Sequence, residues 1–290
     1  MSPRLPRLAL VLVAVLLVPS GCSRIQFAYK SADFLVARYA EDYLELDDRQ
    51  LERWEPQLKT ALDTHRAEEL PQLAAFFDQT LKASRAGFDA SNTRCLVDSS
   101  RDLYRDHARL AVGLAAPLLA GLDRRQIDAL ERRFQTDNAD DRIKPGTDPA
   151  RERRKRIQRY TKSIEEWTGP LDAAQRQLVA EIAGRMPDTG QNMLDYRQRK
   201  QQALLALLRS GADEARIRAF LTDWLVDYRD LPPDLEQAGE AIAARVQELL
   251  IRLGASLNGA QRERFQSRLS DLRDDLLALQ SAPRLAPLRC

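Results

Sequence analysis

The chain has 290 residues, of which 30% are charged, 44% are hydrophobic and only 6% are aromatic. Its 45 basic and 43 acidic residues are interleaved and leave a net charge of +2, which indicates neither nucleic-acid binding nor broad adhesion to anionic lipid. Strong helix formers dominate and strand formers are scarce, so an all-α fold is expected.

The first 21 residues are predicted to be a cleaved signal peptide. Arg4 and Arg7 supply a basic start, and residues 8–18 form an unbroken apolar run of eleven. A transmembrane helix needs about 20 apolar residues, whereas the apolar region of a signal peptide needs about 7 to 15. The run therefore predicts export and not a membrane span.

A cysteine follows this run directly. The segment Pro19-Ser20-Gly21-Cys22 resembles the lipobox of bacterial lipoproteins, although Pro19 stands where that pattern usually has Leu. The resemblance implies a diacylglyceryl group on the Cys22 sulfur, cleavage before Cys22 and acylation of the new amino terminus. Several acyl chains anchor a protein stably in a membrane, whereas a single chain anchors it only marginally. By the sorting rule of that class, Ser23 directs the protein to the outer membrane, facing the periplasm. An ordinary secretory peptide with a coincidental cysteine is the alternative.

Apolar residues recur at helical spacing in nearly every later segment, and Pro or Gly separates the segments. About ten helices with mostly short connections are expected, packed as an antiparallel bundle. The predicted helices cover residues 27–45, 47–70, 72–91, 96–120, 123–137, 149–167, 172–186, 189–209, 213–230, 233–254 and 258–280. An exposed linker, 138–148, is predicted between an N-terminal half, 22–137, and a C-terminal half, 149–281. A flexible tail, 282–290, follows.

Four helix starts share a pattern in which Leu precedes Asp or Asn, and Gln follows three residues after the Asp or Asn. The Asp or Asn is expected to accept a hydrogen bond from an unpaired backbone N–H, and the Gln to reach back to the cap residue's own N–H. These capping boxes pair Asp47 with Gln50, Asp123 with Gln126, Asp172 with Gln175, and Asn258 with Gln261. Their irregular spacing argues against a solenoid of one repeated unit.

This pattern resembles the Leu-Thr-x-x-Gln motif of the Spy and CpxP periplasmic chaperones, with Asp or Asn in place of Thr. The resemblance implies a helical cradle that holds partly unfolded clients. Helix capping alone explains the pattern and is the favoured interpretation, with the chaperone analogy as the alternative.

The helix after the first capping box carries an apolar stripe that ends in polar residues. His65 and Glu69 are four residues apart, close enough for the carboxylate to hydrogen-bond the imidazole and raise its pKa. The candidate polar cluster comprises Trp54, His65, Arg66, Glu68 and Glu69. It is interpreted either as a binding or proton-transfer cluster or as a structural pair at the helix end. His107 is the only other histidine, too few for a histidine-rich zinc site, so no metal site is predicted.

Two cysteines remain besides Cys22. Cys95 and Cys290 could form a disulfide in an oxidising periplasm and so hold the C-terminal tail. The alternative is a free thiol on a disordered C-terminus.

Two further segments, Tyr39–Asp47 and His65–Pro71, carry a closer resemblance. Together with the lipobox and the capping motifs, they resemble an uncharacterised family of all-helical lipoproteins of Gram-negative bacteria, a domain of unknown function. That resemblance implies a fold and a location but no activity.

Signatures of catalysis, such as a nucleophile elbow, a phosphate-binding glycine loop or a His-Glu-x-x-His zinc motif, do not occur in the sequence. We therefore expect a non-enzymatic interaction or scaffold protein without a cofactor, with a chaperone-like role as one version. Its expected partners are the membrane, through the lipid on Cys22, and an envelope protein. A carrier or sensor of a hydrophobic ligand is the alternative, and it predicts an open apolar cavity between helices. An enzyme centred on His65 is a third hypothesis, and it predicts acidic groups from other helices within hydrogen-bond reach of that imidazole.

Overall fold

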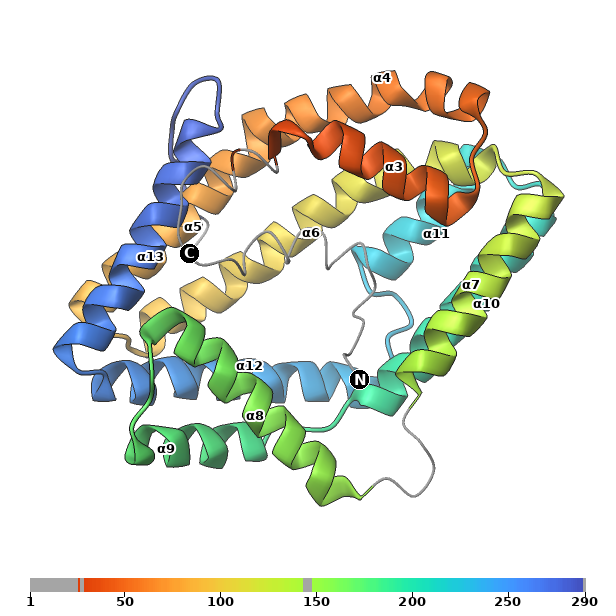
Figure 1. Cartoon of the computed structure of the whole chain (residues 1–290). Coiled ribbons are helices and arrows are strands. Elements are labelled where there is room, and N and C mark those ends of the chain that lie inside the picture. The colour runs from red at the N-terminus through yellow and green to blue at the C-terminus, as the bar shows by residue number, and fades with distance from the viewer. Residues whose placement is uncertain (1–25, 27–28, 143–147, 289–290) are drawn as a thin grey trace.

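In the computed structural model, residues 26, 29–142 and 148–288 are described, and all regular secondary structure among them is helical. The predicted all-α fold is confirmed (Figure 1). The elements are α3 (Ala32–Leu44), α4 (Asp48–Thr64), the π-helical turn η1 (His65–Glu69), α5 (Leu70–Ala86), α6 (Ala90–Ala120), α7 (Arg124–Asp141), α8 (Pro149–Thr168), α9 (Ala173–Gly184), α10 (Gly190–Arg209), α11 (Glu214–Leu225), α12 (Pro233–Ser256) and α13 (Gly259–Ala278).

The start of α6 and the end of α11 differ from the predictions for identifiable reasons. α6 begins at Ala90 and not at residue 96, because Asp89 accepts hydrogen bonds from two backbone N–H groups and forms a capping box of its own. α11 ends at Leu225 and not at residue 230. The backbone of Tyr228 and Asp230 has φ of 52° and 61°, a left-handed conformation that cannot continue an α-helix.

The helices form a frame around α6, which crosses its interior (Figure 1). α5 packs along α13, α6 along α11 and α7 along α10. Each of these pairs joins the predicted N-terminal half to the predicted C-terminal half. The two halves therefore share extensive helix–helix interfaces.

The predicted linker, 138–148, begins inside a helix. α7 continues to Asp141, and Asn138 is buried against α10, where its Nδ2 donates to Gln201 Oε1 at 2.7 Å. Arg197 of α10 donates to Asn138 Oδ1 and to Asp141. In the sequence, these polar side chains suggested an exposed linker. In the structure, they hold α7 against α10. Residues 143–147 lie outside the described residues.

Two four-helix units repeat within the fold. The first consists of α3, α4, α6 and α7, and the second of α8, α9, α12 and α13. In each unit the first helix packs on the second and on the fourth, and the second packs on the third. Each unit also contains two of the four predicted capping boxes. An internal repeat is therefore present, although the copies of the motif are irregularly spaced in the sequence.

All four capping boxes are present with both of their hydrogen bonds, and they associate in pairs. The side-chain amides of Gln50 and Gln126 donate to each other's oxygen at 3.1 and 2.7 Å. Gln175 and Gln261 do the same at 2.8 and 2.9 Å. Each amide also donates to the backbone carbonyl two residues before the partner's cap residue. Each motif thus caps its own helix and joins it to a second helix start.

α4 and α5 form one bent helix where two separate helices were predicted. Because Pro71 has no N–H, the carbonyl of Ala67 four residues before it lacks its usual α-helical donor, and the backbone widens into η1 just before this point. The guanidinium of Arg284 donates to the Ala67 carbonyl at 3.1 Å, and the N–H of Ala286 donates to the Pro71 carbonyl at 3.1 Å. The tail predicted to be flexible is therefore bound to this bend at residues 284–286.

Candidate functional site

The π turn η1 presents His65 and Glu69 to the protein interior. Both side chains belong to residues that are only 8% exposed. A π turn inserts an extra residue into the helical repeat, a feature that is frequent at functional sites. The predicted pair therefore lies at the one place where the regular hydrogen bonding of the long α4–α5 helix changes.

The two histidines of the chain meet at this turn. The rings of His65 and His107, which lies on α6, are 5.2 Å apart in an edge-to-face arrangement. On its other side His65 faces Tyr29, whose hydroxyl lies 2.9 Å from His65 Nδ1. Three elements distant in sequence thus converge here: the segment before α3, η1 and α6.

Burial shifts the pKa values of His65 and Tyr29 and so sets their protonation states. Burial lowers the pKa of His65 to about 4, aided by the nearby His107 and Arg66. The imidazole is therefore neutral at pH 7, and its Nδ1 is hydrogen-bonded to the Tyr29 hydroxyl, which also donates to the Leu62 carbonyl at 3.4 Å. Burial also raises the pKa of Tyr29 to about 12, so its hydroxyl stays protonated.

Glu69 completes the cluster. Its Oε2 lies 3.7 Å from His107 Nδ1, which itself donates to the Leu103 carbonyl at 2.6 Å. Burial raises the pKa of Glu69. Among the described residues, His65 Nε2 and Glu69 Oε2 are buried polar atoms without a hydrogen-bond partner. Such atoms destabilise a fold unless something else compensates them.

The other members of the predicted cluster lie elsewhere. Trp54 is buried in a separate apolar cluster, where its Nε1 donates to the Leu114 carbonyl at 3.0 Å, so its place in the polar cluster was predicted wrongly. Glu68 is exposed. Arg66 lies at the edge of the cluster, over the ring of Tyr29 at 5.5 Å and paired with Asp63.

The enzyme hypothesis predicted acidic groups from other helices within hydrogen-bond reach of His65. In the described part of the chain, a tyrosine hydroxyl occupies that place. No group of three or more His, Cys, Asp or Glu side chains that could hold a metal ion occurs among the described residues. The cluster as built joins three elements through a hydrogen bond and ring contacts.

The predicted lipid site, Cys22, lies outside the described residues, as does Cys290. Cys95 is disulfide-bonded. Its pairing with Cys290 stays a prediction. In the region that the structure describes, none of the helices is long and apolar enough to cross a membrane.

An apolar pocket of about 300 Å³ lies where α5, α8, α12 and α13 meet. Such a volume is at the small end of the range for ligand pockets. Four of the eight phenylalanines of the chain line it, together with one of its three tryptophans. The lining residues are Phe76, Phe77, Thr80, Phe88, Ser163, Ile164, Trp167, Thr168, Leu249, Leu250, Leu253, Gly254, Leu257, Phe265 and Leu269. None of them is ionisable.

No local pattern in the sequence predicts this pocket, because its lining comes from α5 and from three helices of the second unit, α8, α12 and α13. A concentration of phenylalanine at 76, 77 and 88 is the only local signal. Gly254 admits one of these rings: a Cβ atom there would lie 2.6 Å from Phe88 Cδ2. The absent side chain lets Phe88 approach α12 and helps to form the aromatic wall.

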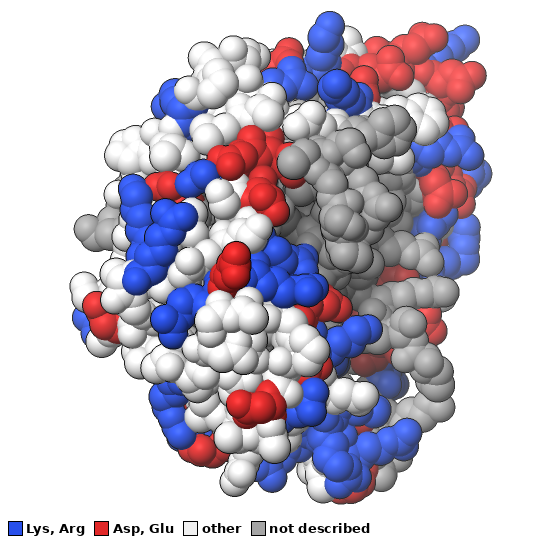
Figure 2. All heavy atoms as spheres, turned by 60° about the vertical axis from the view of Figure 1, so that its left-hand side comes forward, with Lys and Arg blue, Asp and Glu red and all other residues white. Residues whose placement is uncertain are grey.

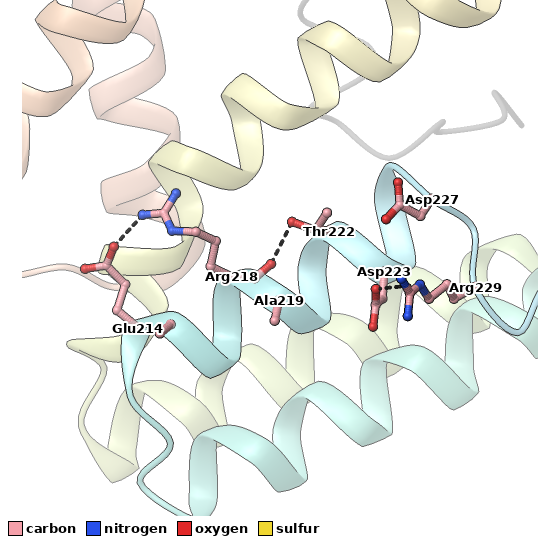
Figure 3. Close-up of a pocket in the computed structure, with 8 residues that line it drawn as sticks. Glu214, Arg218, Ala219, Thr222, Asp223, Asp227 and Arg229 are labelled. Carbon is pink, nitrogen blue, oxygen red and sulfur yellow. Dashed lines mark hydrogen bonds and ion pairs between the residues drawn. The ribbon is translucent and has the colours of Figure 1, made fainter.

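A second hollow, of about 640 Å³, lies on the surface of α11 (Figure 3). Its polar side chains pair with one another, Arg218 with Glu214 and Arg229 with Asp223. The hydroxyl of Thr222 donates to the carbonyl of Arg218 at 2.9 Å. Because one short helix and the turn after it form this hollow, it is a shallow polar surface.

Surface charge favours no polyanionic or polycationic partner. Figure 2, which turns the α5–α13 side of the molecule forward, shows basic and acidic side chains mixed with uncharged ones. This distribution agrees with the near-neutral composition of the chain.

The fold and its sites define an all-helical protein built from two repeated four-helix units. The model of a family of unknown function, DUF6279, matches residues 42–229, which is more than half of the chain. The chain belongs to this family. The match spans three of the four capping motifs and the whole of the His65 cluster except Tyr29. No curated protein and no solved structure matches the chain.

Proposed function

We propose that this protein is a lipoprotein of the cell envelope, lipidated on Cys22 and held at the outer membrane facing the periplasm, where it binds an apolar group of a partner. It works by binding and not by catalysis. The partner is a hydrophobic segment of an envelope protein or a hydrophobic ligand.

The aromatic-lined pocket carries the binding part of this proposal. An open apolar cavity between helices was the observation expected of a hydrophobic-ligand carrier, and the same cavity suits an apolar side chain of a protein partner. A pocket without ionisable lining groups offers no acid or base that could activate its hydroxyl groups, which favours binding over catalysis.

The capping motifs support a structural role more than a client-binding one. The side-chain amide of each capping-box glutamine is hydrogen-bonded both to its own cap residue and to the paired motif. A chaperone-like version of the proposal therefore requires a client surface other than these motifs, and the pocket is the candidate.

Photocrosslinking in intact cells tests the proposal. A photoreactive residue replaces Ser163, an exposed position of α8 at the pocket, and the matched control carries it at Arg53, an exposed position of α4. We expect a reproducible set of envelope proteins or lipids to crosslink from position 163 and not from position 53. We also expect the set to be lost in a Cys22→Ala background. Identical products from both positions would refute the pocket as the binding site.

Fractionation of the same cells tests the anchor. The unaltered chain should remain with the outer membrane, and the Cys22→Ala chain should be released into the periplasmic fraction. If both chains fractionate alike, lipidation of Cys22 is refuted.

A further inference from the structure

Two charged side chains lie at one end of the apolar pocket. Trp167 forms part of its wall, and the guanidinium of Arg268 lies 5.1 Å from the centre of the Trp167 ring. Arg264, one turn earlier on α13, extends beside Gly169, so that a Cβ atom at Gly169 would lie 3.5 Å from Arg264 Cδ. Gly169 directly follows Thr168, the last lining residue of α8. Two arginines thus flank the end of the pocket formed by Trp167 and Thr168.

The two arginines differ in the hydrogen bonds and ion pairs that they form within the protein. Arg268 donates to the carbonyl of Glu166 near the C-terminal end of α8. Arg264 is exposed and forms no ion pair with any carboxylate among the described residues, whereas Arg273 of the same helix pairs with Asp78. A guanidinium in this position can form charge-assisted hydrogen bonds with a carboxylate or a phosphate.

We propose that the pocket binds a single-chain anionic amphiphile, with its alkyl chain among the phenylalanines and its charged head at Arg264. This inference rests on the proposed binding function and names its ligand class. A volume of about 300 Å³ accommodates one chain and not a two-chain lipid. Arg264 orients the ligand, because its charge attracts the anionic head to one end of the pocket and no lining residue is acidic. A fatty acid and a lysophospholipid with a terminal phosphate share this chemistry.

Trp167 provides a direct readout of occupancy. The other two tryptophans, Trp54 and Trp224, pack in other clusters, so a brominated chain in the pocket should quench Trp167 alone. The experiment titrates the purified full mature chain carrying Cys22→Ala, so that no acyl group of its own competes. Brominated dodecanoate and dodecyl phosphate, below their micelle concentrations, distinguish a carboxylate head from a phosphate head, and dodecanol is the uncharged probe.

We expect saturable quenching by one or both anions that disappears with Trp167→Phe. A series of shorter fatty acids should bind about fourfold more weakly per methylene removed, as for a chain that is fully buried. Dodecanol should bind roughly tenfold more weakly than the anions. Arg264→Gln should abolish that preference, and Arg53→Gln, at an exposed arginine of α4, should leave it unchanged.

Blocking the mouth provides the last control. Ser163→Phe places a ring at an exposed lining position without adding a tryptophan and should abolish quenching, whereas Ser163→Ala should not. Equal binding of dodecanol and the anions, or insensitivity to Arg264→Gln, overturns the anionic ligand and leaves the apolar binding function standing. Absence of quenching by all probes, with pocket-dependent crosslinking still seen in cells, overturns the amphiphile alone. Absence of both overturns the proposed function as well.

Discussion

At the scale of single residues, Tyr29 and His65 join the beginning of the described chain to its long bent helix. Tyr29 lies only seven residues after Cys22, so the segment nearest the proposed anchor is tied to the body by a buried hydrogen bond. Any force that the anchor transmits to the helical body must pass through this contact or the chain around it.

Removing the Tyr29 hydroxyl tests this contact. Tyr29→Phe leaves His65 Nδ1 without its hydrogen-bond partner, and we expect a loss of about 1 to 2 kcal/mol in the free energy of unfolding, measured in urea. Tyr160→Phe is the matched control, because the Tyr160 hydroxyl is half-buried and forms no hydrogen bond among the described residues. A loss of equal size in both variants would show that the Tyr29–His65 bond contributes nothing specific.

The lowered pKa of His65 predicts a pH dependence of stability. Because the folded protein holds this pKa at about 4 and an unfolded histidine titrates near 6.5, the unfolded state binds more protons between these values. Stability from this group is therefore complete above about pH 6.5 and is lost as pH falls towards 4. We expect a loss of about 2 kcal/mol between pH 7.5 and pH 5.

Glu69 works in the opposite direction, since its raised pKa makes the folded state bind the extra proton. The difference between the unaltered protein and His65→Gln, which keeps an acceptor for Tyr29, isolates the histidine. Unfolding curves at the two pH values should show a smaller loss for the variant. If both proteins lose the same free energy, His65 is not the group that titrates.

Only part of the residue-scale picture is predictable from sequence. His65 and Glu69 are neighbours on one helix face, which is a local relation. Trp54 shares that face, but eleven residues of helix separate it from His65 by about 16 Å. Tyr29 and His107 reach the cluster through tertiary packing. Local spacing in the sequence cannot predict which distant residues will contact His65.

At the scale of secondary-structure elements, the paired capping boxes decide how helices meet. The capping boxes were predictable because each one consists of residues within a single helix start. Their pairing was not, because Gln50 and Gln126 are 76 residues apart and Gln175 and Gln261 are 86 apart. Amide groups that cap one helix while donating to a second helix start couple the two positions energetically.

Gln126→Ala tests this coupling. Gln126 is 2% exposed, and its loss leaves the Asp123 N–H and the Glu45 carbonyl without this partner. We expect a loss of about 3 kcal/mol in the free energy of unfolding. Asn92→Ala removes a capping box that has no paired motif among the described residues and should cost about 1 kcal/mol. Similar losses in the two variants would show that pairing between motifs adds no stability.

At the scale of the whole molecule, the N-terminal and C-terminal halves pack together through α5, α6 and α7 and their partners α13, α11 and α10. The sequence suggested two halves separated by a linker, because a run of Asn and Asp followed by Pro and Gly is typical of an exposed connection. The polar residues of that run instead pair with α10. Which polar residues are buried depends on partners from distant helices. Composition alone therefore could not reveal the contacts between the two halves.

The three cysteines link the proposed anchor to the covalent structure of the whole chain. Cys95 is disulfide-bonded, and the chain has only two other cysteines, Cys22 and Cys290. A Cys22 sulfur that carries a diacylglyceryl group cannot also form a disulfide. Lipidation of Cys22 therefore requires that Cys95 pair with Cys290 within the chain.

Mass spectrometry of the non-reduced protein, isolated from the membrane and digested with a protease, distinguishes these pairings. We expect a peptide containing Cys95 joined to one containing Cys290, and an amino-terminal peptide whose mass includes the acyl groups. Reduction should lower the free energy of unfolding by about 2 to 4 kcal/mol, because the bridge closes a long loop and restricts the unfolded chain. Cys290→Ser should lower it to the same extent without reductant. A peptide that joins Cys95 to Cys22 would exclude lipidation of those molecules and with it the anchored location.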